Sequence, residues 1–176
     1  YSSRLIPIFA TSPARFVLKL LGEILCAGTF MASNPSILLI EDSPGECELF
    51  RLALIQTGLD VTLFTEQDAE AALHFLEDRA HHSPLPSLIL LDLHLHGEDG
   101  CALLKRLKDD ARFATIPVVI FTTSDHQHDL ARCQANRANG YVVKPGTFDQ
   151  LVYCVGAICG FWIACNVMPH QAVHQC

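Results

Sequence analysis

The stretch Ser87-Leu88-Ile89-Leu90-Leu91-Asp92, with the loop that follows it to Gly100, decides how this chain folds. Leu88 to Leu91 is an unbroken apolar run with prolines before it and polar residues after it. Such a run predicts a short strand that is buried on both faces, as in the middle of a parallel sheet. Asp92 then lies at the carboxyl end of that strand, where open α/β sheets bind ligands. A lone Asp in this position would more simply be a turn or capping residue.

Apolar runs and helical patterns alternate along the chain on both sides of this stretch. Strands are expected at Ser36–Ile40, Val61–Thr65, Leu88–Leu91, Pro117–Phe121 and Tyr141–Val143. Helices are expected at Pro44–Gly58, Asp68–Glu77, Asp99 to about Asp110, from Asp125, and from about Thr147 to Ala164. Five strands that are each followed by a helix predict an α/β fold, a doubly wound five-stranded parallel sheet with helices on both faces.

Local signals support the ends of these elements. Ser43 can cap the first helix, Pro44 fits its first position, and Glu46 stands where a capping box needs an acid. The segment Asp78–Ser87 contains two His and two Pro residues and is expected to be a linker.

Composition narrows the class of protein. Half of the 176 residues are apolar, which is enough for the core of one domain. A net charge of −7 argues against non-specific DNA binding and against a membrane surface. The eight cysteines form no C-x-x-C pair and no zinc-like spacing with His, so free thiols in a reducing cytoplasm are expected, with a disulfide framework as the alternative.

Residues 1–35 do not follow the alternating pattern. We expect an N-terminal extension, either non-native or disordered, with Met31 as the natural start; the alternative is a short helix, Ala14–Cys26, that docks on the domain. The apolar segment Phe16–Phe30 carries two charges and is too short for a membrane span. Residues 36–164 are expected to form the domain, and residues 165–176 a tail.

Polar residues follow four of the five expected strands. Glu41 and Asp42 follow the first strand, Asp92 the third, Thr122 the fourth and Lys144 the fifth. Parallel strands bring all of these residues to one edge, where three carboxylates repel one another unless a cation lies among them. An all-oxygen site favours Mg²⁺, and a lysine beside it can hold an anion. A carboxylate nucleophile, a divalent metal, a lysine and a hydroxyl are together suited to forming an aspartyl phosphate.

Several motifs occur in an order that matches a known family. They are Ile37-Leu38-Leu39-Ile40-Glu41-Asp42, Leu90-Leu91-Asp92 with Asp99-Gly100, Val118 to Thr122, and Tyr141-Val142-Val143-Lys144-Pro145. With these motifs, the chain from Ile37 to about Trp162 resembles the response-regulator receiver domain of bacterial two-component signalling (CheY-like). The resemblance implies a flavodoxin-like sheet of strand order 2-1-3-4-5 with five helices.

The resemblance also implies roles for single residues. Asp92 would be the phospho-acceptor, with Lys144 as the phosphate-pairing lysine and Thr122 as the switch hydroxyl. The metal, Mg²⁺ with Mn²⁺ or Ca²⁺ as substitutes, would be held by Asp42, Asp92 and the His94 backbone carbonyl, and by Glu41 through water. Tyr141 would be the aromatic switch. The Lys144–Pro145 bond would be cis. No organic cofactor is implied.

The expected function is that of a stand-alone regulator with no effector domain. Three features resemble those of single-domain regulators that partner phytochrome kinases: the long loop before the third strand, Phe121-Thr122-Thr123-Ser124, and Phe161-Trp162. We therefore expect phosphoryl transfer from a sensor histidine kinase and output through protein contacts. We also hypothesise a homodimer formed through the fourth helix, fifth strand and fifth helix. No nucleic acid or membrane partner is expected, and no enzymatic activity beyond self-phosphorylation and autodephosphorylation. The alternatives are a phosphorelay intermediate or phosphate sink, and a metal-dependent phosphohydrolase.

The loop after Asp92 departs from the family pattern. The family usually has Pro four residues after the phospho-acceptor, where this chain has His96. The pairs His94/His96 and His126/His128 could bind zinc or nickel, or sense pH, but exposed loop residues are the simpler interpretation. Ser124, two residues after Thr122, is small and is expected to leave the path of an attacking water open.

Overall fold

The structure is a computed structural model that describes residues 35–166. A five-stranded parallel sheet lies at its centre, in the order β2-β1-β3-β6-β7. The strands are β1 (Ser36–Ile40), β2 (Thr62–Glu66), β3 (Leu88–Leu91), β6 (Val118–Thr122) and β7 (Gly140–Val143). This order confirms the flavodoxin-like topology expected from the sequence. The expectations for residues 1–34 and for most of the tail lie outside the described residues.

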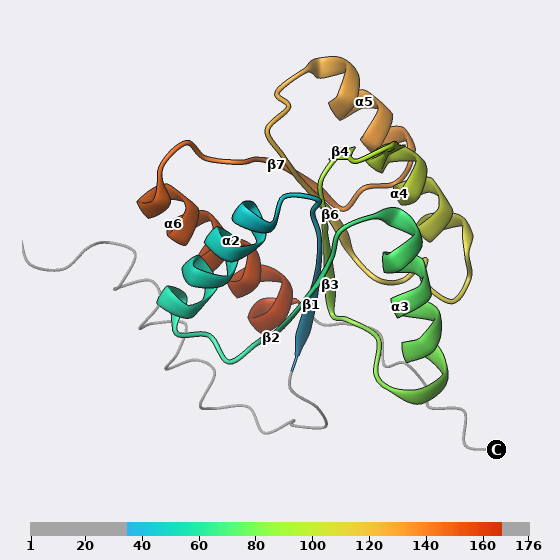
Figure 1. The fold of residues 1–176 in the computed structure, drawn as a ribbon, viewed down its shortest axis with the longest axis horizontal. Coiled ribbons are helices and arrows are strands. Elements are labelled where there is room, and N and C mark those ends of the chain that lie inside the picture. Colours follow the sequence, from blue (N-terminus) through green and yellow to red (C-terminus); the bar gives the residue numbers. More distant parts are fainter. Residues whose placement is uncertain (1–34, 167–176) are drawn as a thin grey trace, which may run out of the picture. The chain divides into compact units, whose positions relative to one another are not determined.

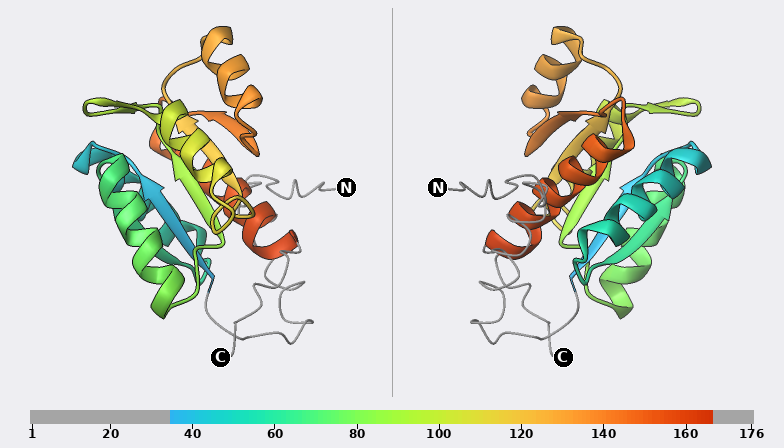
Figure 2. Two further views of the ribbon diagram at one scale, coloured as in Figure 1. Left: turned by 90° about the vertical axis from the view of Figure 1, so that its right-hand side faces the viewer. Right: turned by 90° about the vertical axis from the view of Figure 1, so that its left-hand side faces the viewer.

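Helices cover both faces of the sheet (Figures 1 and 2). They are α2 (Pro44–Thr57), α3 (Ala69–His82), α4 (Gly100–Asp109), α5 (Gln127–Ala135) and α6 (Phe148–Cys159). The apolar side chains of α2 and α6 pack with one set of strand residues, and those of α3, α4 and α5 pack with the other. The sheet is therefore doubly wound, with two cores separated by its strands.

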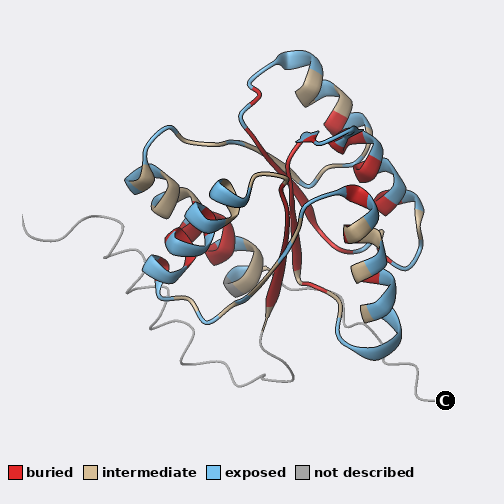
Figure 3. Ribbon diagram, viewed as in Figure 1, coloured by how far each residue is buried: buried red, intermediate tan, exposed pale blue. Residues whose placement is uncertain are grey.

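The central strands are buried along their whole length, as the apolar runs predict. Every residue of β1, β3 and β6 is buried, and Figure 3 shows these strands in red at the centre of the fold. Alternate residues of β1 point to opposite cores: Leu38 and Ile40 contact the side of α3, and Ile37 and Leu39 the side of α2. The edge strand β2 is only half-buried.

The helix ends follow the local chemistry of the sequence. Ser43 caps α2 by accepting from the Glu46 N–H at 3.4 Å, and Gly58 ends the same helix with a positive φ of 72°. Asp68 and Asp99 cap α3 and α4 in the same way through their carboxylates. These caps set the direction in which each helix leaves the edge of the sheet.

Several boundaries differ from the sequence-based expectation. Helix α3 continues to His82, so the first half of the expected linker is helical; the Arg79 side chain donates to the Pro84 carbonyl, and basic residues in the last turn suit a helix C-terminus. The last helix changes at Gly160 into a π-helix, η1 (Gly160–Cys165). Helix α5 begins at Gln127 rather than Asp125.

A small hairpin after Asp92 was not anticipated. Strands β4 (His94–Leu95) and β5 (Glu98–Asp99) pair antiparallel, and Figure 2 shows this hairpin extending beyond the main sheet. Gly97 at its turn has a φ of 80°, a conformation that glycine adopts without strain. The hairpin places the two histidines of the loop, His94 and His96, near the end of β3.

The expectation of a cis Lys144–Pro145 bond is wrong for this structure. Residues 35–166 contain no cis peptide bond, so Lys144–Pro145 is trans. An X–Pro bond prefers trans by about 0.5–1 kcal/mol, so the trans isomer is the one that the peptide bond itself favours.

Within residues 35–166 the cysteines are free thiols, as expected. Cys101, Cys133 and Cys159 are buried, Cys47 and Cys154 are half-buried, and Cys165 is exposed. Among residues 35–166, no helix combines the length and apolarity needed to cross a bilayer.

Candidate phosphorylation site

The backbone at the carboxyl edge of the sheet holds the expected site residues in place. The Asp92 N–H donates to the Ile40 carbonyl at 3.0 Å, which ties the ends of β3 and β1 together. The Lys144 N–H donates to the Thr122 carbonyl at 2.7 Å, which ties β7 to β6. Residues that are more than 100 positions apart in sequence, such as Glu41 and Lys144, therefore meet at one edge.

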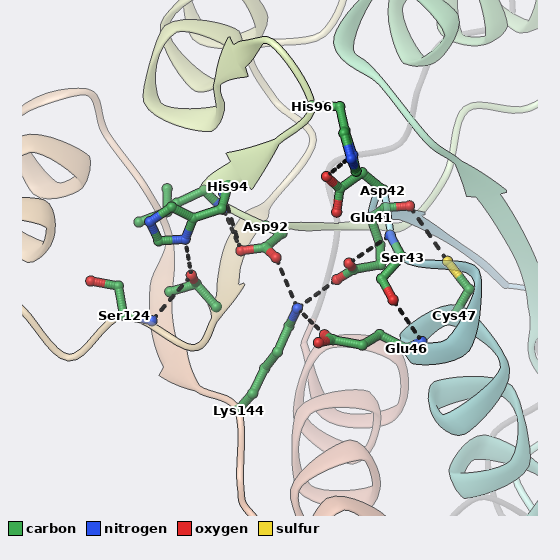
Figure 4. Close-up of polar contacts among 12 residues, drawn as sticks. Glu41, Asp42, Ser43, Glu46, Cys47, Asp92, His94, His96, Ser124 and Lys144 are labelled. Carbon is green, nitrogen blue, oxygen red and sulfur yellow. Dashed lines mark hydrogen bonds and ion pairs between the residues drawn. The ribbon is translucent and has the colours of Figure 1, made fainter.

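The ammonium group of Lys144 is the centre of the site (Figure 4). Its Nζ lies 2.5 Å from Oε2 of Glu41 and 2.9 Å from Oδ2 of Asp92, and it also contacts the carboxylate of Glu46. The side chains of Glu41, Asp92 and Lys144 are only 2%, 8% and 9% exposed. Buried charges of this kind need partners, and here each acid has the same one.

The surroundings shift the pKa values of these groups in different directions. Burial lowers the pKa of Lys144, but its contacts with Glu41, Glu46 and Asp92 outweigh burial and hold it above its usual value. Burial raises the pKa of Glu41, and Lys144 only partly offsets this. Burial also raises the pKa of Asp92, but Lys144, Thr122 and a backbone N–H together bring it below the usual value.

Asp92 is the better stabilised anion because it has more hydrogen-bond donors than Glu41. Its Oδ1 accepts from the Leu93 N–H at 2.6 Å and from the His94 N–H at 3.4 Å, in addition to the Lys144 contact through Oδ2. An ionised carboxylate is the form of Asp that can act as a nucleophile.

Glu46 is a site residue that the sequence reasoning missed. It was expected to complete a capping box, but its carboxylate contacts Lys144, while the Ser43 N–H donates to Oε1 of Glu41 at 3.1 Å. The signal available in the sequence was its position in the first turn of α2, which starts at the same edge of the sheet as Glu41.

Asp42 does not join the cluster around Lys144. The carboxylates whose oxygens lie within 4.8 Å of one another belong to Glu41, Glu46 and Asp92. Asp42, with 16% of its side chain exposed, has its Oδ2 in contact with Nδ1 of His96 in the hairpin instead. Figure 4 shows this pair beside the cluster.

Thr122 is a hydrogen-bond partner of Asp92, and Tyr141 lies near it through the loop after β6. Thr122 is fully buried, and its Oγ1 is 3.5 Å from Nδ1 of His94 and accepts from the Ser124 N–H at 3.3 Å. The half-buried Tyr141 donates its hydroxyl to the Ser124 carbonyl at 3.0 Å. Ser124 directs its own hydroxyl to Asp129 at 2.7 Å. Tyr141 and Thr122 are therefore linked through one residue of the loop after β6.

The chemistry of the site suits a divalent cation. The three clustered carboxylates carry three negative charges and Lys144 one positive charge, which leaves two negative charges uncompensated. Lys144 itself shows that a cation is stable where these oxygens converge. Oxygen ligands of this type are those that Mg²⁺ prefers.

The second histidine pair has no partner in this site. His126 and His128 have side chains that are 80% and 81% exposed, and they lie near their neighbours Asp125 and Asp129 at the start of α5. The simpler interpretation, exposed residues at a helix start, fits this pair.

Sequence comparisons match the chain to curated proteins over most of the domain. It is 36% identical over 139 residues to the probable methanogenesis regulatory protein FilR2 of Methanothrix harundinacea, covering 77% of this chain and 88% of FilR2. It is 35% identical to the response regulator Rcp1 of Synechocystis sp., covering 78% of this chain and 96% of Rcp1.

Solved structures give the same result. The phosphorylated cyanobacterial phytochrome response regulator RcpA superposes with a TM-score of 0.72 at 29% identity, covering 78% of this chain and all of RcpA. The Mn²⁺-bound form of Rcp1 superposes with a TM-score of 0.69 at 33% identity, over 77% of this chain and 99% of Rcp1. The model of the response regulator receiver domain matches residues 37–155, and this chain belongs to that family of two-component signalling domains.

Proposed function

We propose that this protein is a stand-alone response regulator in which Asp92 accepts a phosphoryl group from a sensor histidine kinase. The observation that carries the proposal is the pair of Asp92 and Lys144, with Oδ2 and Nζ 2.9 Å apart and both side chains nearly buried. An ionised carboxylate beside a fixed cation combines a nucleophile with a group that attracts phosphoryl oxygens.

Each residue of the site has its own role in the phosphoryl transfer. A carboxylate oxygen of Asp92 forms the new bond to phosphorus as the phosphorus–nitrogen bond of the phosphohistidine breaks, and the electron pair stays with the imidazole nitrogen. Lys144 turns from Glu41 and Glu46 toward the phosphoryl oxygens, and the Thr122 hydroxyl donates to another of them. Tyr141, linked to Thr122 through Ser124, follows that movement and alters the surface near α5.

We propose that Mg²⁺ is held by Asp42, Asp92 and the His94 backbone carbonyl, with Glu41 acting through bound water. When bound, the ion neutralises charge on the phosphoryl oxygens. Mn²⁺ or Ca²⁺ would substitute, and the Mn²⁺-bound form of Rcp1, a relative, supports this. Two uncompensated negative charges at the cluster favour a divalent ion.

The relatives support a phytochrome-type kinase as the partner, because RcpA is described as a cyanobacterial phytochrome response regulator. A phosphorelay intermediate or phosphate sink uses the same chemistry and differs only in what receives the phosphoryl group. A phosphohydrolase is disfavoured: such enzymes place a D-x-D pair at the end of the first strand, where this chain has Glu41-Asp42. The free thiols are consistent with the cytoplasm.

We further propose that output uses a homodimer formed through α5, β7 and α6, without direct contact to nucleic acid or membrane. Three large apolar side chains on β7, α6 and η1 support this surface: Val143, Tyr153 and Phe161 are 45%, 61% and 55% exposed. Half-buried Trp162 lies next to Phe161, with the two ring centroids 5.0 Å apart. Exposed large apolar side chains on these elements favour a protein contact.

Intact-mass spectrometry after incubation with acetyl phosphate and Mg²⁺ tests the proposed acceptor. Wild type is expected to gain one base-labile phosphoryl adduct that requires the metal. Asp92→Asn removes the nucleophile and is expected to gain none. An adduct that persists in Asp92→Asn, or no adduct in wild type, would contradict the proposal.

A further inference from the structure

One contact of the acidic site has no role in the phosphoryl transfer described above. His96 follows β4 in the hairpin after Asp92, and its Nδ1 contacts Oδ2 of Asp42, the acid at the end of β1. The two residues are 54 positions apart in sequence (96 minus 42), one in the loop after β1 and the other in the turn between β4 and β5. Figure 4 shows the imidazole turned toward the Asp42 carboxylate.

The hairpin determines the backbone position of His96. Leu95, one residue earlier, is only 5% exposed and packs into the core around α3 and α4. The backbone pairs His94 with Asp99 and Leu95 with Glu98, and the Gly100 N–H donates to the Leu93 carbonyl at 3.0 Å. The His96 side chain is nevertheless 86% exposed, so it adds little to the core.

A structural role explains this contact poorly. An ion pair in which one partner is 86% exposed contributes little to stability because solvent screens it. Asp42, by contrast, is a residue with which we propose that the protein holds its divalent ion. A nitrogen donor and an oxygen donor that touch each other can bind the same ion, because neighbouring ligand atoms around a metal lie roughly 3 Å apart.

The other histidine of the loop does not share this position. Nδ1 of His94 lies 3.5 Å from Thr122 Oγ1, whereas Nδ1 of His96 contacts Oδ2 of Asp42. The two side chains therefore do not act as one chelating H-x-H pair. His126 offers a matched control, since it is an exposed imidazole whose neighbour is Asp125 at the start of α5.

We propose that His96 is a metal ligand of this receiver, next to Asp42, and that it shifts the preference of the site from Mg²⁺ toward first-row transition ions such as Mn²⁺ and Zn²⁺. The inference rests on the proposed function, because it places His96 at the metal of that site. Mg²⁺ prefers oxygen ligands and binds imidazole weakly, whereas Mn²⁺ and, more strongly, Zn²⁺ accept nitrogen ligands.

Mn²⁺ titration followed by electron paramagnetic resonance tests this ligand directly. The wild-type spectrum is expected to show a nitrogen hyperfine coupling to the bound Mn²⁺. His96→Ala is expected to lose that coupling and about tenfold in Mn²⁺ affinity. Its Mg²⁺ affinity, measured by calorimetry, is expected to change less than about twofold, because imidazole contributes little to Mg²⁺ binding.

Two control variants make the result specific. His126→Ala, which removes an imidazole that is 80% exposed at the start of α5, is expected to keep the nitrogen coupling and the Mn²⁺ affinity. Asp42→Asn is expected to weaken both Mn²⁺ and Mg²⁺, which places the ion at this site. Circular dichroism checks that each variant is folded.

The inference and the proposed function fail in different ways. If His96→Ala retains the nitrogen coupling, or loses Mn²⁺ and Mg²⁺ affinity equally, His96 is not a selective ligand and the inference is overturned. If Asp92 still gains its phosphoryl adduct with Mg²⁺ in that case, the proposed function stands. If wild type gains no adduct while Mn²⁺ binds through His96, the proposed phosphorylation fails and the metal site remains.

Discussion

Lys144 contacts three carboxylates of this site. Its ammonium group is shared by two buried acids, Glu41 and Asp92, and by the half-exposed Glu46. The arrangement is stable without a phosphoryl group because the lysine balances part of the charge. It also leaves the lysine ready to exchange a carboxylate partner for a phosphoryl oxygen, since both are anionic oxygens.

Replacing Lys144 with Met is expected to destabilise the protein in a pH-dependent way. Met keeps most of the side-chain volume but leaves Glu41 buried without its cation, which costs about 3–5 kcal/mol when the acid is ionised. Burial already raises the pKa of Glu41 above 4.5, and the loss of Lys144 raises it further. The folded variant therefore binds the Glu41 proton more tightly than the unfolded chain does.

The sign of this linkage sets the measurement. A carboxyl group whose pKa is raised by folding stabilises the folded state below the unfolded pKa of 4.5, and this stabilisation is lost as the pH rises. Urea denaturation should therefore show a larger loss for Lys144→Met at about pH 8 than at about pH 5. Lys105→Met, which removes an exposed lysine paired with Asp109, is expected to change little at either pH. Equal losses for Lys144→Met at both pH values would argue against an unpaired Glu41.

At the scale of elements, the N-terminus of α4 must approach the end of β3 closely. Gly100 begins α4, and a Cβ atom there would lie 2.3 Å from the Asp92 carbonyl oxygen and 2.8 Å from Leu93 Cα. Both neighbours are backbone atoms, so they cannot turn away as a flexible side chain could. The Asp99-Gly100 motif is thus explained by packing against the backbone of the proposed phospho-acceptor.

Gly100→Ala is expected to push α4 away from β3, lower the free energy of unfolding by about 1–3 kcal/mol and slow the phosphorylation of Asp92. Gly45→Ala is the matched control, because its Cβ would meet nothing closer than 3.8 Å in the first turn of α2. Thermal denaturation and the rate of adduct formation with acetyl phosphate measure the two effects. A Gly100→Ala protein with wild-type stability and rate would show that the close approach is not required.

At the scale of the whole molecule, the surface of β7, α6 and η1 offers exposed apolar residues to a second copy. Light scattering is expected to show a dimer, and Tyr153→Glu with Phe161→Glu is expected to give a monomer because charge disfavours burial at the interface. Ile55→Glu on α2, also at a 61% exposed position, is expected to leave the dimer intact. A wild type that is monomeric both with and without beryllofluoride and Mg²⁺ would reject this interface.

The sequence alone predicted neither the hairpin after Asp92 nor the contact of Glu46 with Lys144. The apolar runs of β1, β3 and β6 could be read directly, because strands buried on both faces need continuous apolar residues. The two-residue strands β4 and β5 have no such pattern, since their stability comes from backbone pairing and from Leu95 in the core. The direction of the Glu46 side chain depends on a lysine 98 residues away.

The sequence by itself determined the parallel sheet, its strand order through the family resemblance, and the meeting of Glu41, Asp92, Thr122 and Lys144 at one edge. It could do so because strand ends and hydrophobic periodicity are local properties. Only the tertiary structure decided that Glu46 rather than Asp42 joins the Lys144 cluster, that Asp42 contacts His96, and that Lys144–Pro145 is trans. The contacts of Glu46 and Asp42 depend on which side chains the fold brings close enough to pair. Local sequence does not determine the distances between residues that are remote in the chain.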